Sequence, residues 1–198
     1  QQAMDKAGTL RRELGHYLGA TFYFEGEWYW GLDRLHYLEQ RLRESGLARG
    51  NAEGPLLAPP ADVTLDGEPA PGTQRPELHF FFSFRSPYTC ISVPRVRAMA
   101  RHYKADLKLR FILPMVMRGL PVPRAKSLYI LRDTKREADR LGMPFGMVVD
   151  PRGVATERAI AVLHHAIPAG KGEAFAESFL RGVWSEGIDG ASDAGLLK

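Results

Sequence analysis

Residues 80–90, which read FFFSFRSPYTC, constrain the fold more than any other part of this sequence. The apolar run predicts a buried strand over 78–82. Pro87 predicts the first position of a helix, where its missing N–H leaves no hydrogen bond unmade. Ser86 stands at the junction of the two elements. Because a helix N-terminus carries unpaired N–H groups and a partial positive charge, this hydroxyl lies where an anion such as a thiolate would be stabilised.

The elements on either side of this junction predict a parallel sheet. A nearly continuous apolar strand over 78–82 is typical of a strand that is covered on both faces. Helical spacing follows over 88–103, and a second strand is expected over 107–112. A strand, a helix and a strand in this order predict a βαβ unit with a right-handed crossover. The fold class is therefore α/β.

Three more helices are expected after this unit. The segment 124–141 is amphipathic and ends at Gly142-Met143-Pro144, and helical patterns continue over 156–167 and 173–186. Together these helices form a helical block beyond the second strand.

The N-terminal part predicts a β-hairpin followed by a helix. Strands are expected over 20–24 and 27–30, joined by a tight turn, with the alternating Trp28 and Trp30 on a face that packs in the core. Leucines at helical spacing predict an amphipathic helix over 33–45. A hairpin and one helix bury too little surface to be stable alone, so this unit needs a sheet to join.

The segment 46–76 separates these two parts. It carries six prolines, several glycines and no aromatic residue. This composition predicts a linker or an extended surface loop. The expected organisation is therefore a hairpin–helix unit over 1–45, a Pro/Gly-rich linker over 46–76, and a βαβ unit with added helices over 77–198.

Composition excludes several classes of protein. The chain has 198 residues, 44% of them hydrophobic and 25% charged, with a net charge of +4 and no long run of basic residues. This balance shows no dedicated nucleic-acid surface, and no apolar run approaches the roughly 20 residues of a membrane span. The single Cys90 excludes an internal disulfide and a Cys-x-x-Cys pair, which favours a reducing, cytoplasmic setting. The expected partner is a small molecule, and a homodimer remains open.

Each candidate site residue also has a purely structural interpretation. By local sequence alone, Ser86 is more readily a helix cap than a catalytic hydroxyl, and the absence of Gly-x-Ser-x-Gly argues against an acylating serine. Asp33 at a helix start is also typical of a cap. Cys90 is expected to be a small buried apolar residue.

Two groups of polar residues after position 120 are also candidate parts of a site. Lys126, Tyr129 and Asp133 share one helix face, which is either solvated or one wall of a pocket. His164 and His165 are adjacent and point in different directions on a helix, so no metal site is expected.

The strand–Ser-Pro-Tyr–helix junction resembles the thioredoxin-like family that contains DsbA, kappa-class glutathione transferase and 2-hydroxychromene-2-carboxylate isomerase. Its redox members carry Cys-Pro-His-Cys, whereas SPYT over 86–89 is similar to the transferase and isomerase branch. The resemblance extends through Lys126-x-x-Tyr129-x-x-x-Asp133 and the tryptophan-containing stretch 183–189. It also includes 19–35, which is similar to the family's closing hairpin and helix. The implied fold is a thioredoxin-like sheet with a helical insertion.

This resemblance implies glutathione as the cofactor. It places the Ser86 hydroxyl against the glutathione sulfur, and Asp33 with Arg34 at the glutamyl end. Ala20 and Thr21 correspond to the segment whose backbone contacts glutathione, and Lys126 would pair with a ligand carboxylate. Phe84, Tyr88, Met115 and Met117 are candidates for an apolar substrate wall, with core packing as the alternative for each.

The sequence departs from the family in three respects. The closing hairpin precedes the opening βαβ unit, which fits either a piece of a tandem protein or a circular permutation in which 1–45 completes the sheet. Ala20 stands where the family has a cis-proline, and a cis bond before alanine is strongly disfavoured. Ala155 stands where an asparagine is usual.

The function that this resemblance implies is a glutathione-dependent isomerase or transferase of small aromatic or otherwise electrophilic compounds. One alternative is a non-catalytic thioredoxin-like module, which the replacements at Ala20 and Ala155 favour. The other is a thiol–disulfide oxidoreductase, which the absence of cysteine at Ser86 and Thr89 disfavours.

Overall fold

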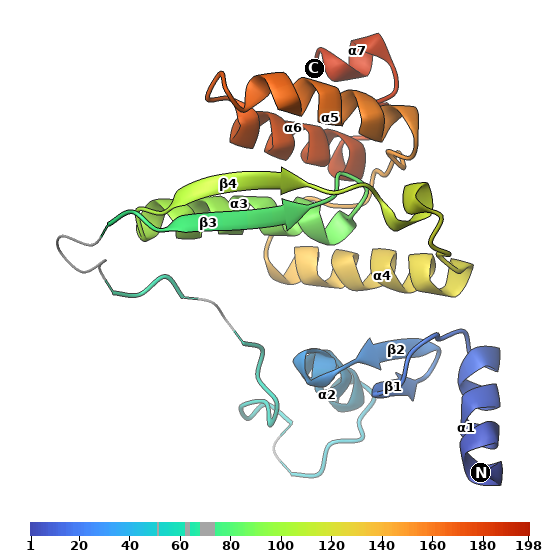
Figure 1. The fold of residues 1–198 in the computed structure, drawn as a ribbon. Coiled ribbons are helices and arrows are strands. Elements are labelled where there is room, and N and C mark those ends of the chain that lie inside the picture. The colour runs from blue at the N-terminus through green and yellow to red at the C-terminus, as the bar shows by residue number, and fades with distance from the viewer. Residues whose placement is uncertain (51, 62–63, 68–73) are drawn as a thin grey trace. The chain divides into compact units, whose positions relative to one another are not determined.

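The computed structural model describes residues 1–198 except 51, 62–63 and 68–73, and these described residues form two compact units, 1–64 and 65–198. Both units combine helices with a two-stranded sheet (Figure 1). The α/β class predicted from the sequence is confirmed.

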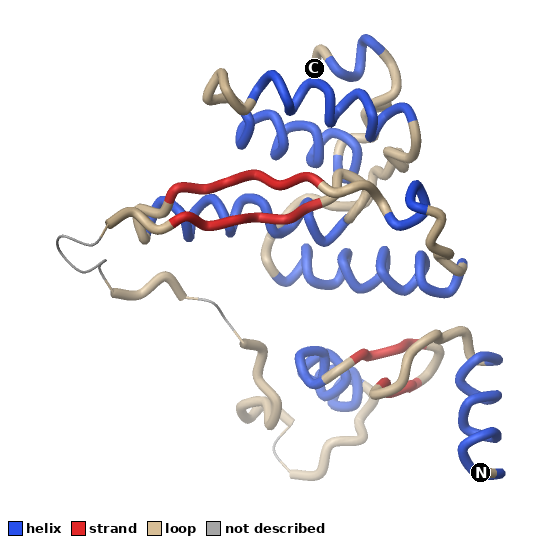
Figure 2. Tube along the Cα trace, in the orientation of Figure 1, coloured by secondary structure: helices blue, strands red, loops and turns tan. Residues whose placement is uncertain are grey.

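The second unit is built on the expected βαβ arrangement. Strand β3 (Glu77–Phe82), helix α3 (Pro87–His102) and strand β4 (Asp106–Phe111) follow one another, and the two strands pair in parallel, as Figure 2 shows. The register runs from Glu77 opposite Asp106 to Phe82 opposite Phe111. Each boundary lies within one residue of the sequence-based expectation.

The prediction that both faces of β3 are covered is wrong for the described residues. Exposure alternates along the strand: Phe82 is 2% exposed, whereas its neighbour Phe81 is 65% exposed. The side that carries Phe81 also carries His79, paired with Lys108 of the neighbouring strand. The run of three phenylalanines therefore belongs to a strand with one covered and one open face, because side chains alternate between faces with a period of two.

Five further helices lie in the described residues of the second unit. They comprise the 3-10 helix η2 (Met115–Arg118) and the α-helices α4 (Arg124–Arg140), α5 (Val154–Ala166), α6 (Gly172–Ser185) and α7 (Asp193–Leu196). The predictions for α4, α5 and α6 are confirmed within two residues. The short η2 and α7 were not predicted, because a single turn shows no periodicity. Among the described residues, no helix combines the length and apolar character that crossing a bilayer requires.

The core of the second unit lies where α6 packs against α3 and α5. Figure 1 shows α5 and α6 side by side, and α3 along the β3–β4 pair. Leu163 of α5 and Leu180 of α6 are fully buried. The buried cluster consists of Phe82, Phe84, Cys90, Val93, Ala155, Ala159, Leu163, Ala176, Phe179, Leu180, Val183 and Trp184. This packing holds the end of β3 and the start of α3 against α6.

The first unit contains the predicted hairpin and helix. Strands β1 (Thr21–Phe24) and β2 (Glu27–Trp30) pair antiparallel, and η1 (Leu32–Arg34) leads into α2 (Leu35–Glu44). A further helix, α1 (Gln2–Glu13), precedes them and was not predicted. It carries no buried residue.

The expected core position of Trp28 and Trp30 is wrong. Tyr29, on the opposite strand face, is 1% exposed, whereas Trp30 is 39% exposed. Trp28 is half-buried, and its Nε1–H donates to the carbonyl of Leu14 at 3.0 Å. The polar ring nitrogen of Trp28 thus finds a partner just after α1, while Tyr29 is the buried residue of β2.

The described residues of 46–76 contain no helix or strand. The parts of the predicted linker at 51, 62–63 and 68–73 lie outside the described residues. Its first part is held to α2: the Glu39 carboxylate accepts the N–H groups of Leu57 and Ala58 at 2.9 and 3.0 Å, and Arg43 donates to carbonyls over 52–55. The hydrogen bond from the Leu57 N–H lowers the pKa of Glu39.

Candidate active site

The candidate site is built around the turn from β3 into α3. Ser86 is the N-cap of α3 in an extended conformation, and Pro87 occupies the first helical position. The Ser86 Oγ accepts the N–H of Thr89 at 3.4 Å, and the Ser86 N–H donates to the carbonyl of Ser83 at 3.0 Å. Ser86 is therefore a helix cap, as the local sequence predicted. A hydroxyl can accept and donate at the same time, so Ser86 can still donate its hydrogen to a ligand.

Two long-range contacts hold this turn in place. The Nε1–H of Trp184 on α6 donates to the carbonyl of Phe84 at 3.1 Å, in the buried core. Arg85 forms two hydrogen bonds with the carboxylate of Asp150, at 2.7 and 2.8 Å. A bidentate pair of this kind fixes orientation as well as distance. The two residues directly before Ser86 are thus anchored by segments far away in the sequence.

A cavity of about 340 Å³ opens beside this turn. Ser86, Pro87 and Tyr88 form its wall at the start of α3. The remaining lining residues are Ser83, Arg85, Ile112, Leu113, Pro114, Met115, Arg118, Val122, Ser127, Ile130, Leu131, Val148, Asp150 and Trp184. Aliphatic and aromatic side chains dominate this set, and a few hydroxyls and charges interrupt them. Such a lining, at the lower end of the ligand-pocket size range, suits a small apolar molecule with a polar group.

The structure brings together three of the predicted site residues. Ser86, Tyr88 and Met115 lie on the wall of one cavity. Phe84 does not: it is 1% exposed and packs against core aromatic rings, including Phe179 at a centroid distance of 4.9 Å. The expectation that Phe84 lines a substrate wall is therefore corrected to core packing.

Two other residues predicted at the site stand outside the cavity lining. Met117 lies in η2 and is not part of the wall. Lys126, in the first turn of α4, directs its Nζ to the Met115 sulfur at 3.8 Å. The predicted pairing of Lys126 with a ligand carboxylate stays a prediction.

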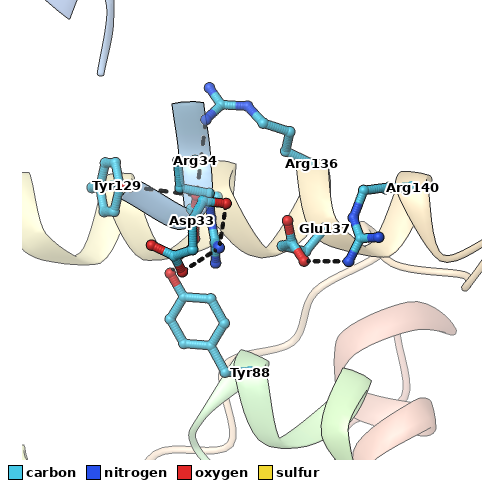
Figure 3. A network of polar contacts seen from close by, with 8 residues as sticks. Asp33, Arg34, Tyr88, Tyr129, Arg136, Glu137 and Arg140 are labelled. Atoms are coloured by element: carbon cyan, nitrogen blue, oxygen red, sulfur yellow. Dashed lines mark hydrogen bonds and ion pairs between the residues drawn. The ribbon is translucent and has the colours of Figure 1, made fainter. Parts of the chain in front are cut away.

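The remaining predicted residues belong to the first unit. Ala20 has a left-handed backbone with φ of 55°, and Thr21 begins β1. Asp33 lies in η1, where its carboxylate accepts a hydrogen bond from the Arg34 guanidinium at 2.7 Å. Figure 3 labels both residues. Their predicted contacts with glutathione stay predictions.

Sequence reasoning missed Arg85, Asp150 and Arg118 as residues of this cavity. Arg85 directly precedes Ser86, so its position in the chain was a usable signal. Asp150 lies in the loop after α4, and nothing local connects it with a residue 65 positions earlier. Arg118 follows β4 in η2, an element with no periodic pattern.

Cys90 lies away from the cavity, as expected for a buried apolar residue. It is 7% exposed, and its Sγ lies 3.7 Å from the carbonyl of Leu180. Burial raises the pKa of the Cys90 thiol to about 11. A thiol of this kind stays protonated near neutral pH, so it does not supply a nucleophile. Among the described residues, no group of three or more His, Cys, Asp or Glu side chains is arranged to hold a metal ion.

The charges around Ser86 favour an anion. Helix α3 has 16 residues, so its N-terminus presents the partial positive charge of a full helix dipole. Arg85 and Arg118 add two guanidinium groups to the wall, of which Arg85 is paired with Asp150. The geometry combines an anion-stabilising hydroxyl with an apolar chamber.

The comparison with protein-family models agrees with this architecture. The model of the DSBA-like thioredoxin domain family matches residues 77–198. The solved structure of a selenomethionine 2-hydroxychromene-2-carboxylate isomerase is similar to this chain, at 20% sequence identity and a TM-score of 0.46. That similarity covers 59% of this chain and 60% of the isomerase chain, so the match spans less than two thirds of that protein. No curated protein sequence matches this chain.

Proposed function

Since the chain belongs to the family of DSBA-like thioredoxin domains, we propose that it is a glutathione-dependent isomerase or transferase acting on small aromatic or otherwise electrophilic compounds. The observation that carries this proposal is the apolar cavity at the start of α3, with the Ser86 hydroxyl on its wall. An apolar chamber suits an aromatic substrate. A hydroxyl at a helix N-terminus suits the thiolate that attacks it.

The donor set at Ser86 fits a glutathione sulfur. The Ser86 oxygen already accepts the Thr89 N–H, so the hydroxyl hydrogen is available to donate to a thiolate. Glutathione, when bound, would supply the nucleophilic thiolate. Hydrogen bonding from Ser86 and the positive end of α3 both favour the charged form of that thiol and lower its pKa.

The other wall residues bind the electrophile and exclude water. Ile112, Met115, Ile130 and Trp184 surround the space beside Ser86 with carbon atoms. Their low polarity strengthens the attraction between the helix N-terminus and a buried thiolate, since the same charges interact more strongly where water is absent. The Arg118 guanidinium on this wall would orient a substrate that carries partial negative charge.

Calorimetry at millimolar glutathione tests the proposal, together with thiolate absorbance near 240 nm across a pH series. We expect wild-type protein to release heat and to lower the thiol pKa of bound glutathione. A hydrogen bond to a charged group is worth roughly 1.5–3 kcal/mol, so Ser86→Ala should raise that pKa by about one to two units. Ser127→Ala is the matched control, because it removes a hydroxyl from the same cavity wall. Absence of heat from wild type, or an unchanged pKa in Ser86→Ala, would refute the proposal.

A second candidate is a non-catalytic thioredoxin-like module. Ala20, with its φ of 55°, stands where the resemblance has a cis-proline, and this replacement favours a domain without the catalytic contact. Such a module would give no heat with glutathione and no difference between wild type and Ser86→Ala. The oxidoreductase alternative is disfavoured, because the one cysteine of the sequence is buried with a raised pKa.

A further inference from the structure

We propose that Asp133 is a positioning residue: through its hydrogen bond to Tyr88 it fixes the wall of the cavity next to Ser86. Asp133 does not line the cavity, whereas Tyr88 does. Asp133 would therefore act on a ligand only through the tyrosine. This inference rests on the proposed function for its catalytic consequence, but the position of Tyr88 can be tested without glutathione.

The contact between the two residues is short. The Tyr88 hydroxyl donates to Asp133 Oδ2 at 2.6 Å, which joins the first turn of α3 to the middle of α4. Figure 3 shows Tyr88 extending from α3 toward α4, where Tyr129 and Arg136 are labelled. An O–H to carboxylate hydrogen bond of this length is charge-assisted and about twice as strong as a neutral one.

Asp133 is built into α4 as a fixed acceptor. It is 2% exposed, and its second oxygen accepts the Tyr129 hydroxyl at 3.3 Å. Arg136 Nη1 lies 3.8 Å from the same oxygen. A buried carboxylate with several donors has few alternative positions, because any movement would leave a buried charge without a hydrogen bond.

This arrangement decides what Tyr88 offers to a ligand. The hydrogen of its hydroxyl is directed to Asp133, so Tyr88 does not compete with Ser86 as the donor to a thiolate. Its ring is held as an apolar wall instead. The backbone around it is also tied, since Ser92 Oγ donates to the Tyr88 carbonyl at 2.7 Å.

Tyr129 provides a matched control within the same network. Its hydroxyl donates to the same carboxylate, and it is 7% exposed, yet it is not part of the cavity wall. Tyr129→Phe and Tyr88→Phe therefore remove the same chemical group from the same acceptor. Only the second change releases a side chain that lines the cavity.

The experiment compares wild type with Tyr88→Phe, Asp133→Asn and Tyr129→Phe in the full chain. The first readout is the dissociation constant of 8-anilinonaphthalene-1-sulfonate, an aromatic anion that fluoresces in apolar pockets. Met115→Trp narrows the cavity, and the fluorescence lost in this variant shows how much of the dye binds in the cavity. We expect Tyr88→Phe and Asp133→Asn to weaken binding about three- to tenfold, as loss of one hydrogen bond allows. Tyr129→Phe should bind as wild type does.

The second readout uses glutathione with 1-chloro-2,4-dinitrobenzene as the electrophile. Tyr88→Phe and Asp133→Asn should raise the KM for the electrophile about three- to tenfold while the thiol pKa of bound glutathione stays unchanged. If Asp133 and Tyr88 had a purely structural role, these variants would lower the midpoint of unfolding. They would not raise the KM for the electrophile while leaving the thiol pKa of bound glutathione unchanged. If Asp133→Asn does not fold, Tyr88→Phe against Tyr129→Phe still decides the question.

Two results would overturn the inference. One is equal dye binding in Tyr88→Phe and Tyr129→Phe, and the other is a thiol pKa that shifts in Tyr88→Phe as it does in Ser86→Ala. If wild type neither binds glutathione nor turns over the electrophile, the proposed function fails. The dye measurement then still tests whether Asp133 positions Tyr88.

Discussion

Replacing Trp184 with phenylalanine tests how the turn before Ser86 is held. The Trp184 Nε1–H donates to the Phe84 carbonyl at 3.1 Å, and the two residues are 3% and 1% exposed. Phenylalanine keeps an aromatic ring at this position but has no donor. The Phe84 carbonyl would then lie in the core without this partner, one residue before Arg85 and two before Ser86.

The size of the effect follows from two contributions. A buried polar group that loses its partner costs about 1–3 kcal/mol. The smaller ring also buries roughly 40 Å² less apolar surface, which is worth about 1 kcal/mol. We therefore expect Trp184→Phe to lower the free energy of unfolding by about 2–4 kcal/mol.

Urea unfolding followed by circular dichroism at 222 nm measures this loss without relying on tryptophan fluorescence. Phe145→Leu is the control, because its ring stacks on Trp184 at a centroid distance of 6.1 Å and leaves the hydrogen bond to Phe84 intact. Phe145 is only half-buried, so replacing its ring with the smaller leucine side chain should cost about 1–2 kcal/mol. If Trp184→Phe destabilises the protein no more than Phe145→Leu does, the hydrogen bond to Phe84 does not hold the turn as argued.

Two further predictions follow from the pKa shifts. Burial raises the pKa of Cys90 to about 11, so iodoacetamide at pH 8 should modify it only after urea unfolds the chain; mass spectrometry showing rapid labelling of the folded protein would contradict this. Because the folded pKa exceeds the ordinary value of 9.0, the unfolded chain releases this proton first, and Cys90 should reduce stability as the pH rises above about 9. Burial lowers the pKa of His16, whose ring lies against Trp28 at a centroid distance of 4.7 Å, so the unfolded chain binds that proton more tightly. Stability should therefore fall as the pH drops through about 6.5, and urea midpoints for His16→Gln should show a smaller pH dependence.

Local sequence signals predicted most of the helices and strands. Pro87 after Ser86 marked the start of α3 to the residue, and the turn after Phe24 placed both strands of the hairpin. These signals succeed because capping and tight turns depend on neighbours in the chain. The burial of individual strand faces was harder to predict. Phe81 and Trp30 are apolar by composition, but their exposure depends on which elements cover each face.

At the candidate site, the difference between what local sequence predicts and what tertiary packing decides is larger. The sequence by itself determined that a hydroxyl begins a helix directly after an apolar strand, and that the chain's one cysteine lies inside that helix. Only the tertiary structure decided what surrounds that hydroxyl. Asp150 and Trp184 contact the turn from 65 and 100 residues away, and Asp133 holds Tyr88 from another helix. A helix cap is formed by residues adjacent in the chain, so the local sequence can predict it. A cavity wall is formed by the packing of separate helices, and no local sequence pattern predicts that packing.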